Sequence, residues 1–176
     1  MNSSGSTGTG GKILQCNLDG SLIKEYDSPA LNYPIGLEML DGKLLVCDRD
    51  GYPKYMYLTE PGSSRILQKY ENPFSEYLGP RSICYDGEQY LYQASTHFST
   101  SDGIIATYII KIDKNTFKEI DRIPLTSRSG IINCRGIEYD KNDKNFWITD
   151  FGGNIYKIAG FETISSVEAV SYTHLR

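Results

Sequence analysis

The sequence lacks the long apolar runs and the dense charge that mark several functional classes. No apolar run approaches the length that spans a bilayer, and none resembles the core of a signal peptide. The net charge of -4 at pH 7 gives no electrostatic case for nucleic acid or for an anionic membrane surface. We therefore expect no nucleic-acid partner and no membrane span.

Metal and nucleotide motifs are also missing. The four cysteines form no CxxC pair and make a poor zinc site. Buried free thiols are the simpler expectation, with an unassigned disulfide as the alternative. Residues 1–11 are rich in Ser, Thr and Gly, which predicts a flexible segment, and they lack the GxxxxGK[ST] pattern of a phosphate-binding loop. The sequence thus predicts no cofactor of its own, although a divalent cation in the full-length parent stays open.

The sequence does contain a series of short strands separated by tight turns. Tyrosine (14) and glycine (17) are abundant, which suits strands and turns better than helices. The stretch from Cys134 to Ile158 predicts three strands, because runs of about five residues alternate with an Asp/Asn/Lys turn and a Gly-Gly turn. No unit has an amphipathic run of helix length. An antiparallel meander is expected there.

The same meander recurs twice earlier in the chain. Strand-like runs begin at Pro34 and Pro80, and each is followed by an Asp-Gly turn and a second apolar run. Gly36, Ser82 and Gly136 occupy corresponding positions, with intervals of about 46 and 54 residues, a range typical of propeller blades or solenoids. Because the units contain only strands, a propeller is favoured over a helical solenoid.

The predicted fold class is all-β, a partial β-propeller of about three four-stranded antiparallel blades that form an open arc. In the second strands the alignment matches Trp147 with Leu45 and Leu91, so Trp147 is interpreted as core between blades rather than as a binding aromatic. The expected segments between residues 12 and 169 are a half blade (12–28), two blades (34–73 and 80–125) and a partial blade (134–169). Ser95–Gly103 is predicted as a polar insertion, and Glu162–Val170 as the candidate fourth strand of the last blade.

The last seven residues, 170–176, read VSYTHLR. They resemble the translation of a sequencing adapter found in metagenomic reads, so we expect an artefactual tail there. A propeller closes with typically four to eight blades. We therefore expect this chain to be a fragment whose partners include the missing blades of its own parent chain.

The repeated pattern resembles bacterial β-propellers of the NHL-repeat, gluconolactonase-like and streptogramin-lyase-like group. The resemblance covers roughly residues 12–165 and departs from the pattern at Ser82 and Ala94 in the middle blade. The residues that carry it are Pro34, Gly36, Leu37, Asp41, Gly42 and Asp48, matched by Gly136, Ile137 and Asp150. Since such folds host binding, scaffolding and catalysis alike, the resemblance implies the fold more firmly than the function.

In such a blade the loop before the first strand and the loop after the second lie on one face. Mixed Arg, Asp, His and aromatic side chains on that face would suit a polar ligand, with arginine for carboxylate or phosphate groups and aromatic rings for stacking. Arg49, Asp50, Thr96, Phe98 and Phe151 are expected on the same face. The candidate ligand-binding residues are Arg81, Arg135, Asp48, Asp150, His97 and Tyr52.

Each candidate also has a structural interpretation. Asp48 and Asp150 occupy equivalent strand ends and most simply cap the following turn. Arg81 and Arg135 are not needed for a turn, and pairing with a neighbouring aspartate competes with ligand binding. His97 in a polar insertion is more often a surface residue than a catalytic or metal-binding group.

Glu38 and Glu138 share a repeat position and are the candidates for a divalent-cation site like that of gluconolactonase-like enzymes. That family's Asn-Gly at the inner strand is absent here, and Ile35-Gly36 and its equivalents stand in its place. Neither the His-x-Glu dyad of streptogramin-lyase-like chemistry nor a nucleophile elbow is present.

The function expected from the sequence is a non-catalytic binding module for a small polar ligand or a protein. The alternative is a metal-dependent propeller hydrolase or lyase. The compartment stays open, with an extracellular, periplasmic or cell-surface location favoured.

Overall fold

The computed structural model describes residues 11–28, 33–49, 55–72, 78–99, 103–125, 131, 133–161 and 173–174. Most of the described chain is β-strand, arranged in one two-stranded and three four-stranded antiparallel sheets. No described helix is long and apolar enough to cross a membrane.

Strands follow one another along the chain and pair with their sequence neighbours. The first sheet is a hairpin, and each later sheet is a meander of four consecutive strands. The bounds are β1 Gly11–Cys16 and β2 Leu22–Ser28; β3 Pro34–Leu40, β4 Lys43–Asp48, β5 Tyr55–Thr59 and β6 Ile66–Glu71; β7 Leu78–Tyr85, β8 Tyr90–Ser99, β9 Gly103–Asp113 and β10 Glu119–Pro124; β11 Cys134–Asp140, β12 Asn145–Asp150, β13 Ile155–Ile158 and β14 Thr173–His174.

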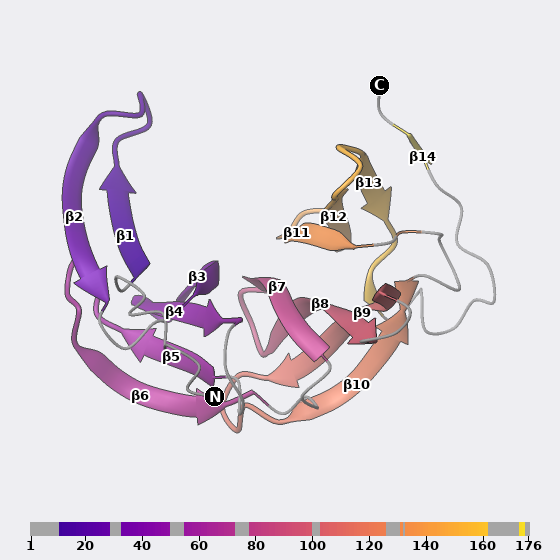
Figure 1. Ribbon diagram of the computed structural model, residues 1–176, viewed down its shortest axis with the longest axis horizontal. Helices are drawn as coiled ribbons and strands as arrows, with labels where there is room; N and C mark the ends of the chain where they lie inside the picture. The colour runs from indigo at the N-terminus through magenta and orange to yellow at the C-terminus, as the bar shows by residue number, and fades with distance from the viewer. Residues whose placement is uncertain are drawn as a thin grey trace, which may run out of the picture.

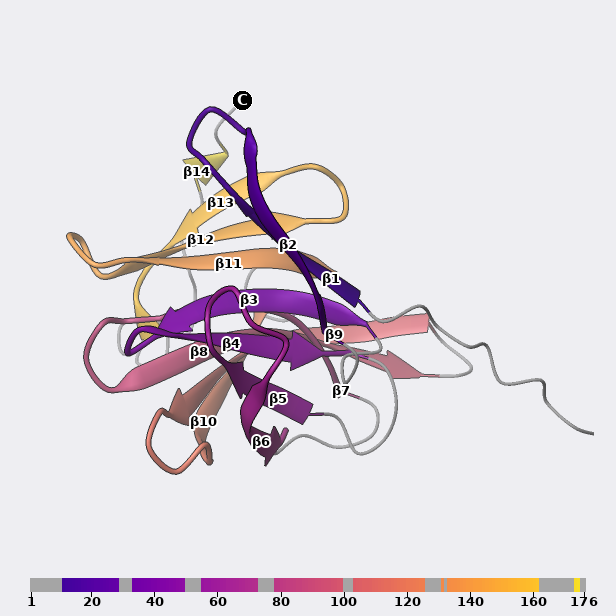
Figure 2. The same cartoon turned by 90° about the vertical axis from the view of Figure 1, so that its left-hand side faces the viewer.

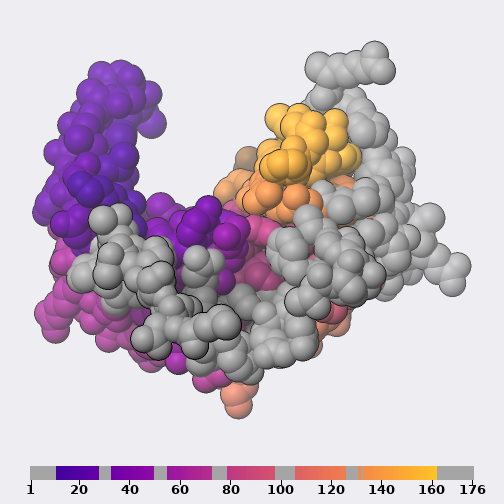
Figure 3. All heavy atoms as spheres, in the orientation of Figure 1, coloured from indigo at the N-terminus to yellow at the C-terminus, as the bar shows by residue number. Residues whose placement is uncertain are grey.

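The sheets stand side by side like blades around an arc (Figures 1 and 2). The first strands of the three meanders, β3, β7 and β11, lie on the concave side, and β7 contacts both of the others. Strands β6 and β10 form the convex side. The hairpin and the last sheet stand apart at the two ends of the arc (Figure 3). The predicted all-β fold class, with blade-like antiparallel sheets in an open arc, is confirmed.

Tight turns explain why these strands pair with their neighbours. At the turn between β3 and β4, Asp41 has φ 49° and Gly42 has φ 77°. Positive φ at both central residues gives the turn a twist that matches antiparallel strands, and Asp-Gly tolerates it at little steric cost. The turn between β7 and β8 is longer, because Tyr85 pairs with Leu91.

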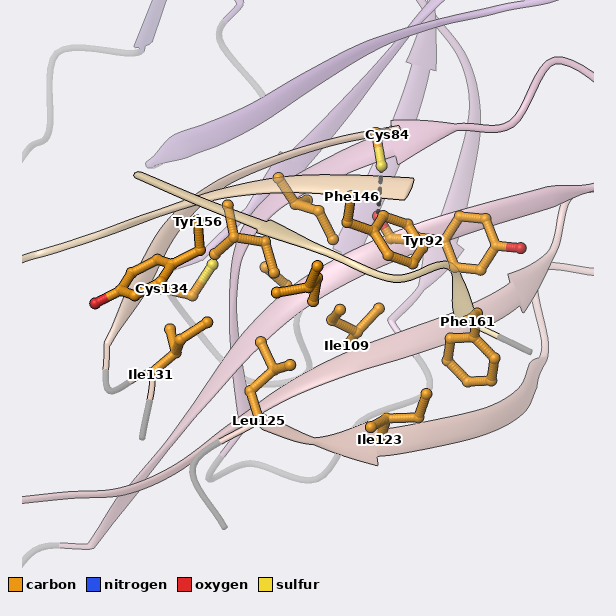
Figure 4. Close-up of a cluster of buried hydrophobic side chains, with 14 residues drawn as sticks. Cys84, Tyr92, Ile109, Ile123, Leu125, Ile131, Cys134, Phe146, Tyr156 and Phe161 are labelled. Carbon is orange, nitrogen blue, oxygen red and sulfur yellow. Dashed lines mark hydrogen bonds between the residues drawn. The ribbon is translucent and has the colours of Figure 1, made fainter. Parts of the chain in front are cut away.

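Hydrophobic side chains fill the spaces between successive sheets. Leu45, Cys47, Met56, Ile83 and Ile110 are fully or almost fully buried between the β3–β6 and β7–β10 sheets. A second cluster joins the β7–β10 sheet to β11–β13 (Figure 4); its largest buried members include Phe146, Ile109, Ile148, Leu125 and Ile131. Alternation along each strand sends one face into each cluster, so the middle sheet is covered on both sides.

The two ends of the arc leave one sheet face only partly covered. Leu37 and Met39 on β3 are each 49% exposed, whereas Ile83 and Ile137, which follow the equivalent bulges of β7 and β11, are 2% and 5% exposed. The hairpin covers Leu44, Val46 and Tyr57 farther from the centre of the arc, but it supplies no strand beside Leu37. The predicted match of Leu37 with Ile137 is therefore correct in register, but the two side chains differ in burial.

The alignment of the middle blade was wrong by one residue. Pairing matches Tyr92, not Leu91, with Leu45 and Trp147, and it places Ser95, not Ala94, at the position of Asp48. The cause is the longer β7–β8 turn, which an alignment anchored on Asp-Gly does not allow for. Trp147 is half-buried, with the Lys157 ammonium 5.2 Å from its ring. It lies on the outer face of the last sheet, where no described sheet packs against it, so its interpretation as inter-blade core stays a prediction.

Two segments and one cysteine also differ from expectation. Ser95–Ser99 continues β8 instead of forming an insertion, and it pairs with β9 through Thr96 opposite Thr107, a pairing that β-branched residues favour. The fourth strand of the last sheet is β14; the segment 162–170 predicted for that role lies outside the described residues. All four thiols are free; Cys47, Cys84 and Cys134 are buried as predicted, but Cys16 is exposed. Burial raises the pKa of Cys47 and of Cys134 to about 12.

Candidate functional site

The candidate residues gather where the inner strands begin. Pro34 pairs with Asp48, Pro80 with Ser95 and Cys134 with Asp150. The starts of β3, β7 and β11 therefore lie at the same edge of the arc as the C-terminal parts of β4, β8 and β12. We name this edge the strand-start rim. The opposite edge, which carries the β3–β4, β7–β8 and β11–β12 turns, is the turn rim.

Each inner strand has the same irregularity at the strand-start rim. The register shifts between Pro34 and Gly36, between Pro80 and Ser82, and between Cys134 and Gly136. The extra residues are Ile35, Arg81 and Arg135. A β-bulge re-aims a side chain and interrupts the ladder. Both arginines predicted as ligand-binding residues therefore sit on bulges at equivalent positions of adjacent strands.

Arg81 is the central charge of the rim, and it is only 2% exposed. Its pKa is lowered to about 10, first because burial strips water from the guanidinium and then because Arg135 and Arg49 add like charge. The Tyr33 side chain acts in the opposite direction. Arg81 is still protonated at neutral pH, so the fold holds a buried cation at this position.

Arg135 and Arg49 each lie over an aromatic ring. The guanidinium carbon of Arg135 is 4.8 Å from the centre of the Phe151 ring, and that of Arg49 is 4.2 Å from the centre of the Tyr33 ring. The backbone supports the Arg49–Tyr33 pair, because the Arg49 N–H donates to the Tyr33 carbonyl at 3.0 Å. Cation–π contact orients both guanidinium groups on the rim.

The two aspartates have mainly structural roles. Asp150 accepts hydrogen bonds from the Asn154 N–H at 2.9 Å and from the Tyr156 hydroxyl at 2.8 Å, which closes the turn between β12 and β13. Asp48 is buried and accepts from the Tyr33 N–H at 2.9 Å, so it fastens the segment before β3. The turn-capping interpretation holds for Asp150. For Asp48 it stays a prediction, because residues 50–54 of the following turn lie outside the described residues.

Asp150 makes the stability of the protein depend on pH. Burial alone would raise its pKa, but the hydrogen bonds from Asn154 and Tyr156 outweigh burial and lower the pKa of the carboxyl group. A carboxyl whose folded pKa lies below its unfolded value of about 4 stabilises the fold above that value. This stabilisation is lost as the pH falls through the folded pKa.

We therefore expect Asp150→Asn to lower the free energy of unfolding by about 1 kcal/mol at pH 7. The difference from wild type should shrink as the pH falls below about 4, measured by urea denaturation across a pH series. Asp27→Asn, at an exposed carboxylate on β2, is the matched control. Equal stability of wild type and Asp150→Asn at every pH would rule out this role.

His97 and Tyr52 complete the predicted set. His97 lies within β8, where its backbone pairs with Leu78 and Ala106, and its side chain is half-buried. The prediction that it lies in a surface insertion is wrong, because the strand continues through it. Tyr52 lies outside the described residues. The other five predicted residues lie at the strand-start rim.

Several buried polar residues at this rim were not among the predicted site residues. Ser95 and Thr96 are fully buried, and Asn133 is 8% exposed. Within the described chain, the two hydroxyl groups and the Asn133 side-chain oxygen have no hydrogen-bond partner. The signal that could have found them is the polar run Ser95-Thr96-His97, which sequence reasoning placed outside the strand.

Glu38 and Glu138 approach each other in the concave centre. Together with Leu37, Met39 and Leu44 they line an open cavity of about 280 Å³. Burial raises the pKa of Glu38, the Met39 N–H opposes the rise, and Glu138 adds to it. The Glu38 carboxylate also accepts from the Tyr85 N–H at 3.1 Å, so it links β3 to β7.

Neither this cavity nor the turn rim provides a metal site among the described residues. No described group of three or more His, Cys, Asp and Glu side chains is placed to hold a metal ion. A second cavity, of about 300 Å³, lies at the turn rim and carries mixed charge. Its lining residues are Asp86, Gly87, Glu88, Tyr139, Lys141 and Lys144.

The fold and the rim together define an all-β, blade-like protein with a cationic edge. No protein-family model and no curated protein matches the chain. The resemblance to NHL-repeat and related propellers therefore stays a prediction.

Proposed function

We propose that these blades belong to a β-propeller binding domain of the NHL-repeat, gluconolactonase-like and streptogramin-lyase-like group. The domain recognises a small polar ligand or a protein at the strand-start rim and performs no catalysis. The observation that carries the proposal is the repeated bulge, which presents Arg81 and Arg135 at equivalent positions of neighbouring inner strands.

The free-energy cost of burying the Arg81 guanidinium group supports a binding role. Burying a guanidinium group costs stability, and the like charges of Arg135 and Arg49 add to that cost. The equivalent bulge of β3 carries Ile35, so the bulge itself does not require arginine. A binding role gives a reason for arginine at two of the three equivalent bulges.

The proposal predicts binding that depends on Arg135. A panel of defined probes, consisting of glucose, glutamine, inorganic phosphate, citrate and an array of short peptides, is titrated against wild type and Arg135→Gln. At least one probe should bind saturably to wild type and about tenfold more weakly to the variant, because a hydrogen bond to a charged group is lost. Arg122→Gln, at an exposed residue paired with Glu119, is the control. The binding role is wrong if no probe binds, or if Arg135→Gln binds every probe as wild type does.

The alternative is a metal-dependent hydrolase or lyase, and the approach of Glu38 to Glu138 favours it. Both carboxylates line one cavity, and oxygen ligands of this kind suit Ca²⁺ or Mg²⁺. Stoichiometric, tight binding of Ca²⁺, Mg²⁺ or Zn²⁺ that is lost in Glu138→Gln would favour the enzyme over the binding domain.

A further inference from the structure

In the described part of the chain, the first sheet has two strands where each later sheet has four. The fourth strand of one sheet leads to the first strand of the next, as β6 leads to β7 and β10 leads to β11. Since β2 leads to β3 in the same way, β1 and β2 correspond to the third and fourth strands of a sheet. No described strand occupies the first and second positions beside β1.

The inner edge of β1 is therefore a free strand edge as far as the described residues go. Strand β1 lies on the inner side of β2 (Figure 1), and its residues, Gly11–Cys16, pair with β2 alone among the described strands. A free edge presents a row of backbone N–H and C=O groups, with which an extended polypeptide can pair. This edge favours a polypeptide strand over a small molecule as its occupant.

An apolar face of β3 lies on the side of the hairpin. Leu37 pairs with Val46 and Met39 with Leu44, and cross-strand partners share a face of the sheet. Val46 and Leu44 pack against Ile13 of the hairpin, so Leu37 and Met39 face the same side. Each of the two is nevertheless 49% exposed, because the hairpin covers only the part of this face that is farther from the centre of the arc.

The next interface shows which strands cover the equivalent face. Ile83 and Tyr85, the counterparts of Leu37 and Met39 on β7, are 2% and 8% exposed.

Those two residues of β7 belong to one buried cluster with Leu40 on β3 and with Leu45 and Cys47 on β4. Strands β3 and β4 are the first and second strands of the preceding sheet. The face of Leu37 and Met39 would thus be covered by two strands that continue the hairpin sheet inward from β1.

Two carboxylates set the charge that such strands would meet. Glu38 and Glu138 line an open cavity of about 280 Å³ together with Leu37, Met39 and Leu44. Lys141 acts on the charge of Glu38 but is not part of the cavity lining. A lysine or arginine on the incoming strands would be complementary to this negative charge.

We infer that the free edge of β1 and the apolar face of Leu37 and Met39 form a docking surface for a β-hairpin of another polypeptide chain. The hairpin adds two antiparallel strands beside β1 and lays apolar side chains on Leu37 and Met39. It places a lysine or arginine near Glu38 and Glu138. The inference goes beyond the proposed function, because this surface does not include the strand-start rim.

The test uses a synthetic hairpin as the probe and the whole chain as its receptor. The probe has the sequence of residues 34–48, which cover the equivalent face of the next sheet. Within the probe, Cys47→Ser prevents oxidation and Glu38→Lys supplies the cation. Fluorescence anisotropy of the labelled probe should show saturable binding to the wild-type chain, and a probe that keeps Glu38 should bind more weakly.

Replacement of one receptor residue locates the surface. Binding of the probe should be about tenfold weaker to Leu37→Asn, because the variant lacks an apolar side chain that becomes buried on docking. Leu37 is half exposed in the free chain, so the variant should fold. Ile155→Asn, at a residue of β13 that is 47% exposed, is the matched control and should bind the probe as wild type does.

A second probe tests the pairing of backbones. N-methylation of the nitrogens that point outward from the second strand of the hairpin removes donors and leaves every side chain in place, so the affinity should fall about tenfold or more. No saturable binding, equal binding of the two probes, or equal binding to wild type and Leu37→Asn overturns the inference. Concentration-dependent self-association that Leu37→Asn abolishes, measured by sedimentation velocity, also overturns it, because the surface then belongs to a second copy of this chain.

Discussion

Replacing Phe146 by alanine is expected to lower the free energy of unfolding by about 3 to 5 kcal/mol. Phe146 is 0% exposed, and its ring meets the Tyr92 ring at 4.9 Å and 73° and the Tyr139 ring at 5.4 Å. It lies in the core that joins the β7–β10 sheet to the last sheet (Figure 4). Truncation removes both aromatic contacts and leaves a cavity between sheets. Urea denaturation followed by circular dichroism measures the loss.

The neighbouring residue provides the matched control. Trp147 points to the opposite face of the last sheet, where it is half-buried beside Lys157. Trp147→Ala should therefore cost about 1 kcal/mol, although tryptophan is the larger side chain. If both variants lose the same stability, the outer face of the last sheet is covered in solution and the open-arc arrangement is wrong.

Gly36→Val should destabilise the protein by about 1 to 3 kcal/mol through crowding. A Cβ at Gly36 would lie 3.2 Å from the Ser82 Cα and 3.3 Å from the Ile83 nitrogen, so the obstacle is the backbone of β7. Glycine is required here because β3 and β7 approach each other closely at the centre of the arc. Valine would push the two inner strands apart, and thermal unfolding should report the loss.

Gly136→Val is the control for Gly36→Val, because the two glycines share a repeat position. A Cβ at Gly136 would meet only the Thr149 side chain, at 2.8 Å from its hydroxyl, and Thr149 is exposed and can rotate away. The loss at Gly136 should therefore be clearly smaller. Equal losses at the two positions would argue against close packing of β3 on β7 as the cause.

Much of the fold could be predicted from local patterns. Asp-Gly turns and short apolar runs predict hairpins because turn chemistry and alternation act within a few residues. The repeat then predicts blade-like sheets. The Asp-Gly pair predicts that a turn is present but not how many residues it contains. The β7–β8 turn is longer than the β3–β4 turn, so Leu91 and Ala94 do not occupy the repeat positions predicted for them.

The candidate site could be predicted only in part. Equivalent repeat positions were enough to identify Arg81 and Arg135. The alternating direction of successive antiparallel strands was enough to place Asp48 and Asp150 at the same rim. The burial of Arg81 and the polar group at Ser95 and Thr96 could not be predicted, because burial depends on which neighbouring sheet lies against each strand. His97 was misplaced for the related reason that pairing with β9 carries polar residues into a strand.

The sequence by itself determined the strands, their antiparallel order and the repeat that sets arginines at the start of two inner strands. These features depend on contacts between residues close in the chain, which local patterns describe. Only the tertiary structure decided that Ile83 is buried while Leu37 is exposed, that Trp147 faces outward, and that the bulges bring Arg81 between Arg49 and Arg135. Those outcomes depend on packing between sheets. Such packing brings together residues that are distant in the chain and decides which side chains lose their contact with water.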